Sequence, residues 1–335
     1  MSKLKVFEKG KAPDKNVYYV CLSAVQKCIR RCDATRAINL AKIAWRCEPF
    51  YFWRRMWVFL AEDCSRNVDA LQLFYNWRTG PYDFEGMVPL IRCMADGPKD
   101  KVGPPLAAFL THRYCSPMQV YLHLKDDPIH IILTELMKKW PDRGLSAYDK
   151  YKFVVGENDY SWLLELAERA EQYDRDKFCY AIPYFFMPET QRESIPPANE
   201  VSELILWNNC FPLEALDMHT RPGQAAYGTY RKRNSTYIVP NDDKTGFGHW
   251  IFWNEGGAMR NRHAYPYDFT RLWLSGVPTQ TKNRVASDYI SSANRELLFS
   301  EVLPEINKIR LWVIEKLYKD DFLRIQVEYQ RDFVE

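Results

Sequence analysis

The sequence lacks any hydrophobic run near the roughly 18 residues that a membrane-spanning helix needs, so we expect no membrane partner. Its first 15 residues contain five lysines but no apolar stretch behind them, which is not the pattern of a secretory signal. The nine cysteines include no C-x-x-C pair, and the six histidines are spread along the chain. These features predict reduced thiols, no zinc site and a cytoplasmic protein, in the host cytoplasm if the chain is viral.

Familiar catalytic and nucleotide-binding motifs are also missing. No G-x-x-x-x-G-K-[ST] phosphate loop occurs, and the glycine-containing stretches at 97–103 and 246–248 lack its spacing. There is no G-x-S-x-G, no H-E-x-x-H and no calcium-binding loop. Asp126, Asp127 and His130 resemble part of a metal site, but Asp127-Pro128 is an ordinary helix start. We therefore predict a non-enzymatic protein with no cofactor and no metal, and the alternative is an enzyme with an unrecognised site.

Charge is nearly balanced overall but segregated along the chain. The 46 Lys and Arg residues and 43 Asp and Glu residues leave a net charge of +3. Residues 1–60 have a net charge of +9, residues 61–220 of −9, residues 221–284 of +6 and residues 285–335 of −3. Two basic blocks on a near-neutral protein favour a localised anion-binding face. The alternative is that the acidic middle neutralises them across an internal interface.

Apolar spacing predicts a mainly α fold. Between 17 and 31, apolar residues recur every three or four positions, and Asp33 is a plausible N-cap for a second helix over 37–44. From Arg284 we expect the chain to return to helix, with a second apolar stripe from Ala293 to Leu317 and Pro304 as a kink or break. Further helices are predicted over 51–62, 69–77, 87–94, 106–114, 118–124, from Pro128 to Met137, over 162–180 and over 200–207.

Prolines at 183–200 indicate a boundary between a helical part, 1–200, and a second part, 201–335. Within the second part, residues 221–284 are rich in glycine. The stretches 227–230, 235–239 and 249–253 there have strand chemistry. We therefore expect a small β-hairpin or long ordered loop at 221–284, followed by long C-terminal helices. We expect both parts to pack as one unit.

One stretch carries a family resemblance. Residues 23–33 are Ser-Ala-Val-Gln-Lys-Cys-Ile-Arg-Arg-Cys-Asp, and Trp53-Arg54-Arg55-Met56 and Ala61-Glu62-Asp63 follow. This succession resembles the helical C-terminal collar of the RarA/MgsA family of clamp-loader-like AAA+ ATPases, over about residues 18–80. That family has S-A-x-x-K-S-I-R-G-S-D, then A-R-R-L and A-S-E-D, and Asp69-Ala70-Leu71 echoes its A-D-P-x-A-L. Arg31 and Cys32 replace its Gly and Ser, and Cys64-Ser65-Arg66 replaces its I-G-L-A.

The resemblance implies a helical collar-like bundle without the ATPase motor. In that family the collar holds subunits together as a tetramer, so it implies a homo-oligomer. A motorless DNA-metabolism module with two basic blocks is similar in kind to the single-stranded-DNA-binding RNA polymerase cofactors of podophages. This similarity implies a role in phage transcription or replication, with a phage RNA polymerase or replication proteins as partners.

The first basic block offers Lys27, Arg30 and Arg31, and the second mixes cations with aromatic rings. Lys and Arg contact phosphates while ring faces stack on unpaired bases, which is the combination that single-stranded nucleic acid requires. The residues predicted to bind nucleic acid are Lys27, Arg30, Arg31, Tyr230, Arg231, Lys232, Arg233, Trp250, Trp253, Arg260, Arg262 and Arg271. The alternatives are structural ion pairs for the cations, favoured for Arg54 and Arg55 with Glu62-Asp63, and core packing for the rings.

Two functional hypotheses follow. The first is a non-catalytic single-stranded-DNA-binding protein that recruits a polymerase through its acidic middle or tail. The second is an oligomeric interaction scaffold, a collar remnant of a replication machine that does not itself touch DNA. Salt separates the two, because phosphate neutralisation weakens steeply with ionic strength and an apolar protein interface does not.

Overall fold

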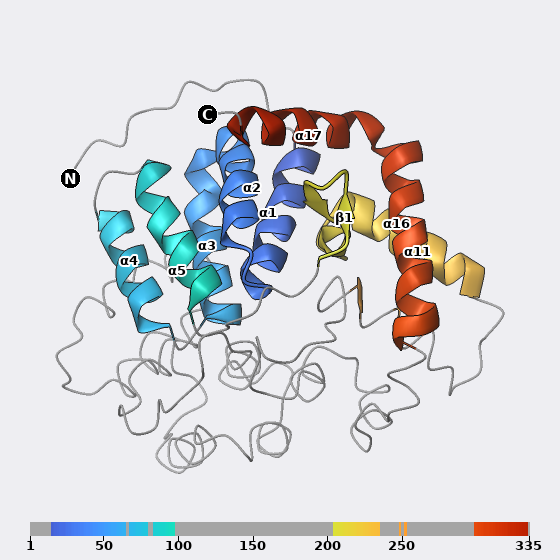
Figure 1. Cartoon of the computed structure of the whole chain (residues 1–335), viewed down its shortest axis with the longest axis horizontal. Helices are drawn as coiled ribbons and strands as arrows, with labels where there is room; N and C mark the ends of the chain where they lie inside the picture. The colour runs from blue at the N-terminus through green and yellow to red at the C-terminus, as the bar shows by residue number, and fades with distance from the viewer. Residues whose placement is uncertain are drawn as a thin grey trace, which may run out of the picture.

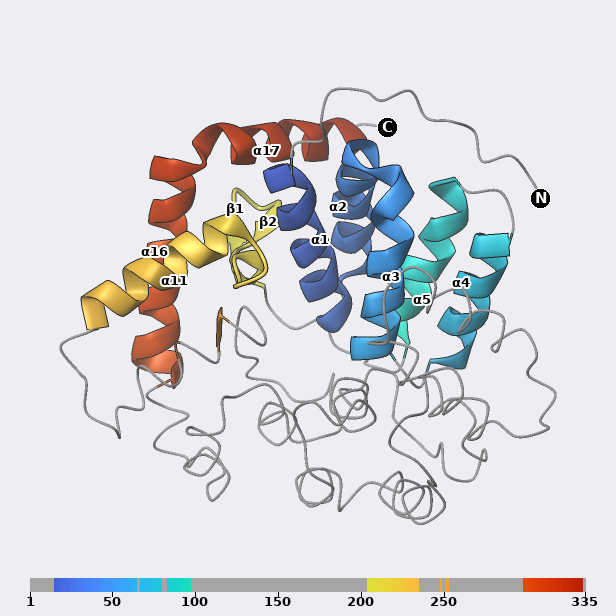
Figure 2. The ribbon, with the colours of Figure 1, turned by 180° about the vertical axis from the view of Figure 1, so that it is seen from behind.

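The computed structural model describes residues 15–64, 67–79, 83–97, 204–234, 248, 251–252 and 298–333. Helices α1 (Lys15–Arg30), α2 (Ala34–Cys47) and α3 (Pro49–Asp63) lie side by side (Figures 1 and 2). Helix α5 (Val88–Asp96) packs against α1 and α2, and α4 (Val68–Thr79) packs against α3 and α5. A 3₁₀ turn (Glu85–Met87) leads into α5. Within the described ranges, no helix is both long and apolar enough to cross a bilayer.

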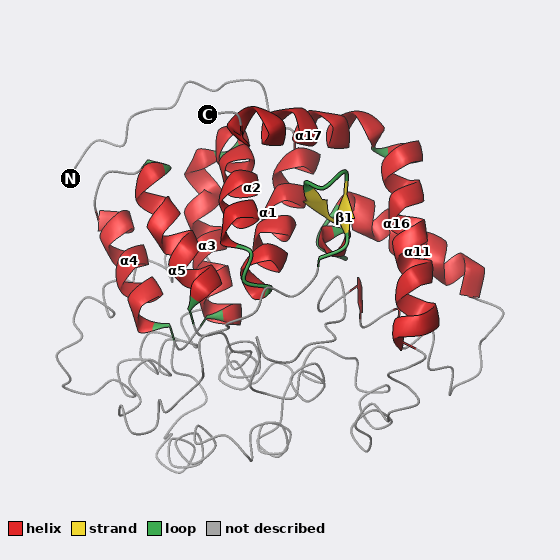
Figure 3. Cartoon of the chain, in the orientation of Figure 1, coloured by secondary structure: helices red, strands yellow, loops and turns green. Residues whose placement is uncertain are grey.

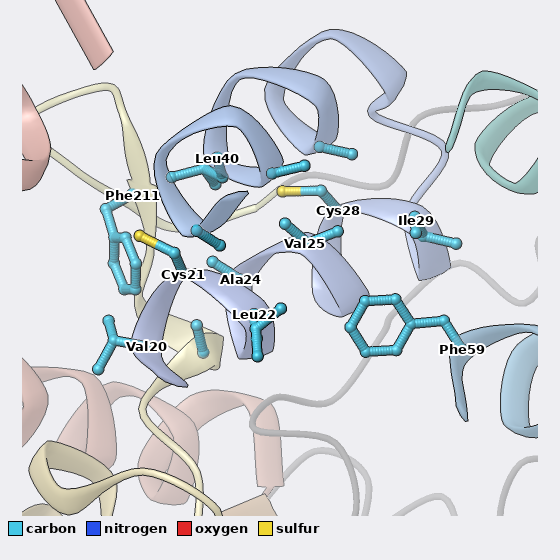
Figure 4. Close-up of a cluster of buried hydrophobic side chains, with 14 of the residues drawn as sticks. Val20, Cys21, Leu22, Ala24, Val25, Cys28, Ile29, Leu40, Phe59 and Phe211 are labelled. Carbon is cyan, nitrogen blue, oxygen red and sulfur yellow. The ribbon is translucent and has the colours of Figure 1, made fainter. Parts of the chain in front are cut away.

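Helix α1 is the centre of the core. Every residue from Val20 to Arg30 is buried, so the helix is enclosed on all sides rather than along one stripe. Figure 4 shows Cys21 and Cys28 pointing toward α2, where Leu40 lies, while Phe59 of α3 lies on the other side of α1. The apolar periodicity predicted for 17–31 is confirmed, because its members Val17, Val20, Cys21, Ala24, Val25, Cys28 and Ile29 are all buried.

Local sequence signals set the helix ends. At the end of α1, Cys32 has a left-handed backbone (φ 62°), and Asp33 N–H donates to the Cys28 carbonyl at 3.0 Å. This is a Schellman cap, with cysteine where glycine is usual. Asp33 then caps α2, its carboxylate accepting from the Arg36 amide at 3.0 Å. Pro49 occupies the first turn of α3, which begins two residues before the predicted start at 51, and its missing N–H costs nothing there.

The described residues after 203 complete the same core. Strands β1 (Leu206–Trp207) and β2 (Phe211–Pro212) form an antiparallel hairpin, with Trp207 opposite Phe211. A 3₁₀ turn η4 (Leu213–Ala215) and helix α11 (Arg221–Asn234) follow. A helical turn η7 (Leu298–Val302) leads into α16 (Leu303–Leu317), and α17 (Lys319–Phe333) comes last. Pro304, predicted as a break, lies in the first turn of α16.

Helix α17 crosses one end of α1 and α2 and holds the hairpin against them (Figure 1). Its buried stripe consists of Phe322, Ile325 and Tyr329. The Phe322 ring meets those of Trp207 and Phe211 edge-on, with centroids 5.7 Å and 5.0 Å apart. Segments more than 200 residues apart in sequence therefore share one hydrophobic core.

The mainly α class is confirmed, and helices dominate the described chain (Figure 3). Three local predictions are wrong. Residues 206–207 form a strand instead of ending a helix, 227–230 belong to helix α11 instead of a strand, and Ile251 and Phe252 lie in a helical turn. In α11, Tyr227 and Tyr230 share one face and pack on Phe252, so burial of that face outweighs their strand propensity. The helices predicted between 106 and 180 lie outside the described residues.

Candidate nucleic-acid interface

The predicted phosphate-binding residue Lys27 lies inside the protein. Only 2% of its side chain is exposed, and its Nζ donates to Asp217 Oδ2 at 2.8 Å. Ser23 Oγ donates to the same oxygen at 2.9 Å, and the His219 amide donates to Oδ1 at 2.9 Å. Lys27 thus joins α1 to the loop before α11.

The carboxylate of Asp217 is held in its charged form by these partners. Burial by itself raises the pKa of Asp217, but attraction to Lys27, together with the hydrogen bonds and positive charge of His219, outweighs it. The pKa of Asp217 consequently lies well below its usual range. His219 Nδ1 lies 3.3 Å from Oδ1, with most of the ring exposed.

Arg30 forms a second buried ion pair. Its Nε donates to Asp63 Oδ1 at 2.6 Å, and its Nη2 lies 3.8 Å from Glu62 Oε2. Gln26 donates to both carboxylates, at 2.7 Å to Asp63 and 2.9 Å to Glu62. The Glu62-Asp63 pair therefore does make a helix-to-helix ion pair, with Arg30 of α1.

Arg54 and Arg55 lie over aromatic rings. The Arg54 guanidinium is 5.9 Å from the centroid of Tyr51, and that of Arg55 is 5.5 Å from the centroid of Phe59. Both rings belong to α3 itself. These contacts give both arginines a structural role within the helix.

Arg31 is also enclosed, with 1% of its surface exposed. Lys27, Arg30 and Arg31 therefore face the interior in this structure, and they form no exposed basic surface. Lys27 pairs with Asp217 and Arg30 pairs with Asp63, and both of these acids belong to the acidic stretch 61–220. This arrangement matches the alternative in which the acidic middle neutralises the first basic block internally.

The second basic block presents exposed cations at the end of α11. Arg231, Lys232 and Arg233 form its last turn, and all three are exposed. Cations at this end are favourable for the helix, because the carbonyl ends of the backbone dipoles point toward them. The Arg231 guanidinium lies 5.7 Å from the centroid of Tyr227. The fourteen residues of α11 include no Asp or Glu.

Tyr230, predicted to contact nucleic acid, lies in the core. It is 1% exposed, and its ring centroid is 6.3 Å from that of Phe252. The other predicted members of this block, Trp250, Trp253, Arg260, Arg262 and Arg271, lie outside the described residues. Among the predicted site residues that are described, the structure brings together Arg231, Lys232 and Arg233 on its surface.

Sequence reasoning missed a buried arginine on α16. Arg310 is fully buried, donating from Nε to the Leu216 carbonyl at 3.2 Å and from Nη1 to Asn307 at 3.0 Å. Its guanidinium lies 5.0 Å from the Phe252 centroid, and burial lowers its pKa to about 10. The available signal was its position between Ile309 and Val313 in an apolar stripe.

Two observations concern metal-ligating and thiol side chains in the described ranges. No group of three His, Cys, Asp or Glu side chains gathers there in a metal-binding arrangement. Burial raises the pKa of the Cys28 thiol to about 12 and that of Cys210 to about 11. Both thiols are therefore protonated and weakly nucleophilic at neutral pH.

Comparison with known proteins adds no relative, since the chain matches no protein-family model, no curated protein and no solved structure. The class that the fold defines is a mainly α protein with an exposed basic turn on α11.

Proposed function

We propose that the chain is a non-catalytic, oligomeric single-stranded-DNA-binding protein that acts as a cofactor in phage transcription or replication. The observation that carries this proposal is the exposed last turn of α11, Arg231 to Arg233, on a helix without an acidic residue. Three adjacent cations create a local positive potential that attracts a polyanion. The cation-rich and aromatic sequence beyond Asn234 supplies the rings for base stacking. The acidic middle or tail recruits the polymerase.

The exposed cations of the C-terminal helices differ from those of α11. On α16 and α17, the exposed Lys316 and Lys319 are neighbours of Glu315 and Asp320, which are also exposed. Mixed signs at short range cancel beyond about 10 Å at 0.1 M salt, so such a surface attracts a polyanion weakly. This contrast favours α11 as the DNA-binding element of the described chain.

The test is fluorescence anisotropy of labelled single-stranded and duplex oligonucleotides against salt. An Arg231→Ala/Lys232→Ala/Arg233→Ala variant removes three cations from α11, and Lys308→Ala/Lys316→Ala/Lys319→Ala removes three exposed ones elsewhere. We expect preferential, salt-steep single-strand binding that weakens in the first variant and changes little in the second. If the wild-type protein binds neither the single-stranded nor the duplex oligonucleotide at low salt, the proposal is wrong.

A second candidate is the oligomeric interaction scaffold, and exposed apolar residues on the last two helices favour it. Leu317 at the end of α16 is 54% exposed, and Val327 on α17 is 64% exposed. Trp312 and Leu323 are also exposed. Light scattering on the eluting protein tests self-association. A dimer or larger species that Leu323→Ser/Val327→Ser converts to monomer, in a protein that does not bind DNA, supports the scaffold. A wild-type monomer at all concentrations argues against it.

A further inference from the structure

We infer that α11 contacts the phosphate backbone of the nucleic acid and takes no part in recognising bases. This inference rests on the proposed function and specifies what that helix recognises. Phosphate contact by cations is thereby assigned to α11, and base stacking by aromatic rings is not. It also predicts that α11 binds equally well whichever bases the strand carries.

The ring of Tyr227 already has two neighbours within the protein, Phe252 and Arg231. Its centroid lies 5.4 Å from that of Phe252, and the Arg231 guanidinium lies over the ring at 5.7 Å. The side chain is partly buried, and burial raises the pKa of its phenol above the usual value although Arg231 acts in the opposite direction. A base needs an open ring face for stacking, and Phe252 and Arg231 take up the space around this ring.

Tyr230 is enclosed even more completely. It is buried against Phe252, and a Cβ placed at Gly248 would come within 2.1 Å of its ring carbon Cε1. The backbone at 248 therefore covers the ring closely, and only glycine fits there without a shift. Both tyrosines of α11 consequently hold the helix to the core, where they serve stability rather than recognition.

The exposed side chains that remain on α11 are Arg221, Gln224, Arg231, Lys232 and Arg233. Gln224 donates its side-chain amide to the Met218 carbonyl at 3.1 Å, so its polar group has a partner within the protein. The rest are cations. Arginine can donate two parallel hydrogen bonds to a phosphate, and lysine acts on it as a point charge.

The two ends of the helix reach separate phosphates. At 1.5 Å per residue, Arg221 and Arg231 are about 15 Å apart along the axis. Between them, Gly228 has no side chain, and a Cβ placed there would meet no other atom within 4 Å. A backbone strand lying along α11 can therefore meet a cation at each end, with Gln224 and Gly228 between them.

The test compares two single strands of equal length, an oligothymidylate and an abasic phosphodiester strand, by anisotropy with the full chain. The variant is Arg231→Ala/Lys232→Ala/Arg233→Ala, with the Lys308/Lys316/Lys319 alanine variant as the charge-matched control. We expect the variant to lose the same factor in affinity on both strands. The slope of log affinity against log salt should fall by about 2 on both, since each phosphate contact contributes about 0.7 on single strands.

A second variant, Tyr227→Leu, removes the ring that lies beside the cations. A ring that stacks on a base is worth about 5- to 150-fold in affinity by alanine substitution. We expect the ratio of affinities for thymidylate and abasic strand to stay unchanged in this variant. The ratio is measured on one protein sample, so a general loss of stability does not imitate the effect.

The outcomes are distinct. A loss in either variant that is several-fold larger on thymidylate than on the abasic strand overturns this inference and leaves DNA binding intact. Equal losses on both strands in the triple variant support it. No binding of wild-type protein to thymidylate at low salt overturns the proposed function itself, and the inference with it.

Discussion

Replacing Lys27 by methionine removes the cation that faces the buried carboxylate of Asp217 and keeps an unbranched side chain in its place. Asp217 retains the hydrogen bonds from Ser23 and from the His219 amide, but it loses its buried ion-pair partner. Removing one member of a buried pair costs about 3–5 kcal/mol, because the other charge stays desolvated. The surviving hydrogen bonds place the expected loss near the lower end of that range.

The corresponding change in melting temperature follows from chain length. An unfolding entropy of about 2.1 cal/mol/K per residue gives about 0.7 kcal/mol/K for 335 residues unfolding together. A loss of about 3–5 kcal/mol then lowers the midpoint by about 4–7 °C. Lys316→Met, at an exposed position on α16, is the matched control and should change stability by less than about 0.5 kcal/mol.

The pH dependence of folding stability provides an independent test of this ion pair. In the wild-type protein the pKa of Asp217 is depressed, so its contribution to stability is present above the unfolded value of about 3.9 and is lost as pH falls below it. Without Lys27, the pKa of Asp217 rises from its depressed position, because the strongest attraction that lowers it is gone. The stability deficit of the variant is therefore largest at neutral pH and shrinks as the pH falls through the pKa that Asp217 has in the folded variant.

The assay is urea denaturation of wild type, Lys27→Met, Asp217→Leu and the double variant at several pH values. Replacing both members of a buried pair by apolar residues is often neutral, so the double variant should be more stable than either single variant. Strictly additive losses, or a Lys27→Met deficit that does not change with pH, would refute the assignment of Lys27 as a structural partner of Asp217.

Two further predictions concern α11 and the buried thiols. Gly223→Ala should destabilise the protein by about 1–3 kcal/mol, because its Cβ would lie 1.8 Å from the Asp217 carbonyl oxygen. Gly228→Ala, whose Cβ would lie in open space, should stabilise it by about 0.5–1 kcal/mol. Urea denaturation of both variants measures these changes, and equal effects would contradict the prediction. Cys28 and Cys210, whose pKa values burial raises to about 12 and about 11, should resist alkylation until the protein unfolds. Mass spectrometry of alkylated peptides measures this, and rapid labelling of the native protein at either cysteine would disprove it.

Local patterns predicted much of the described fold. The apolar spacing from Val17 to Ile29 located α1, Asp33 was correctly predicted as the N-cap of α2, and the helix predicted over 51–62 matches α3 to within two residues at each end. Such signals depend on neighbours within a turn or two, which a single sequence contains. Leu317, predicted to lie in the apolar stripe of α16, is exposed, because the helix ends there and the chain turns into α17.

The site was harder to predict because its partners are distant in sequence. Lys27 and Asp217 are 190 residues apart, and nothing in the chemistry of a lysine on a helix shows that an aspartate will meet it in the core. The run of cations at 231–233 indicates the basic turn of α11, but the strand predicted just before it, at 227–230, is part of that helix. Tyrosines at 227 and 230 fit either structure, and Phe252, which decided between them, lies beyond the local window.

The position of α17 over α1 has a consequence for synthesis. Helix α1 emerges from the ribosome before α17, because Phe322, Ile325 and Tyr329, which close its end of the core, are translated almost 300 residues later. At about 5–20 residues per second, the interval is roughly 15–60 s. During that time the faces of α1 and α2 that α17 will cover have no permanent partner. Apolar surface left uncovered on a nascent chain can associate with other chains until α17 has been made.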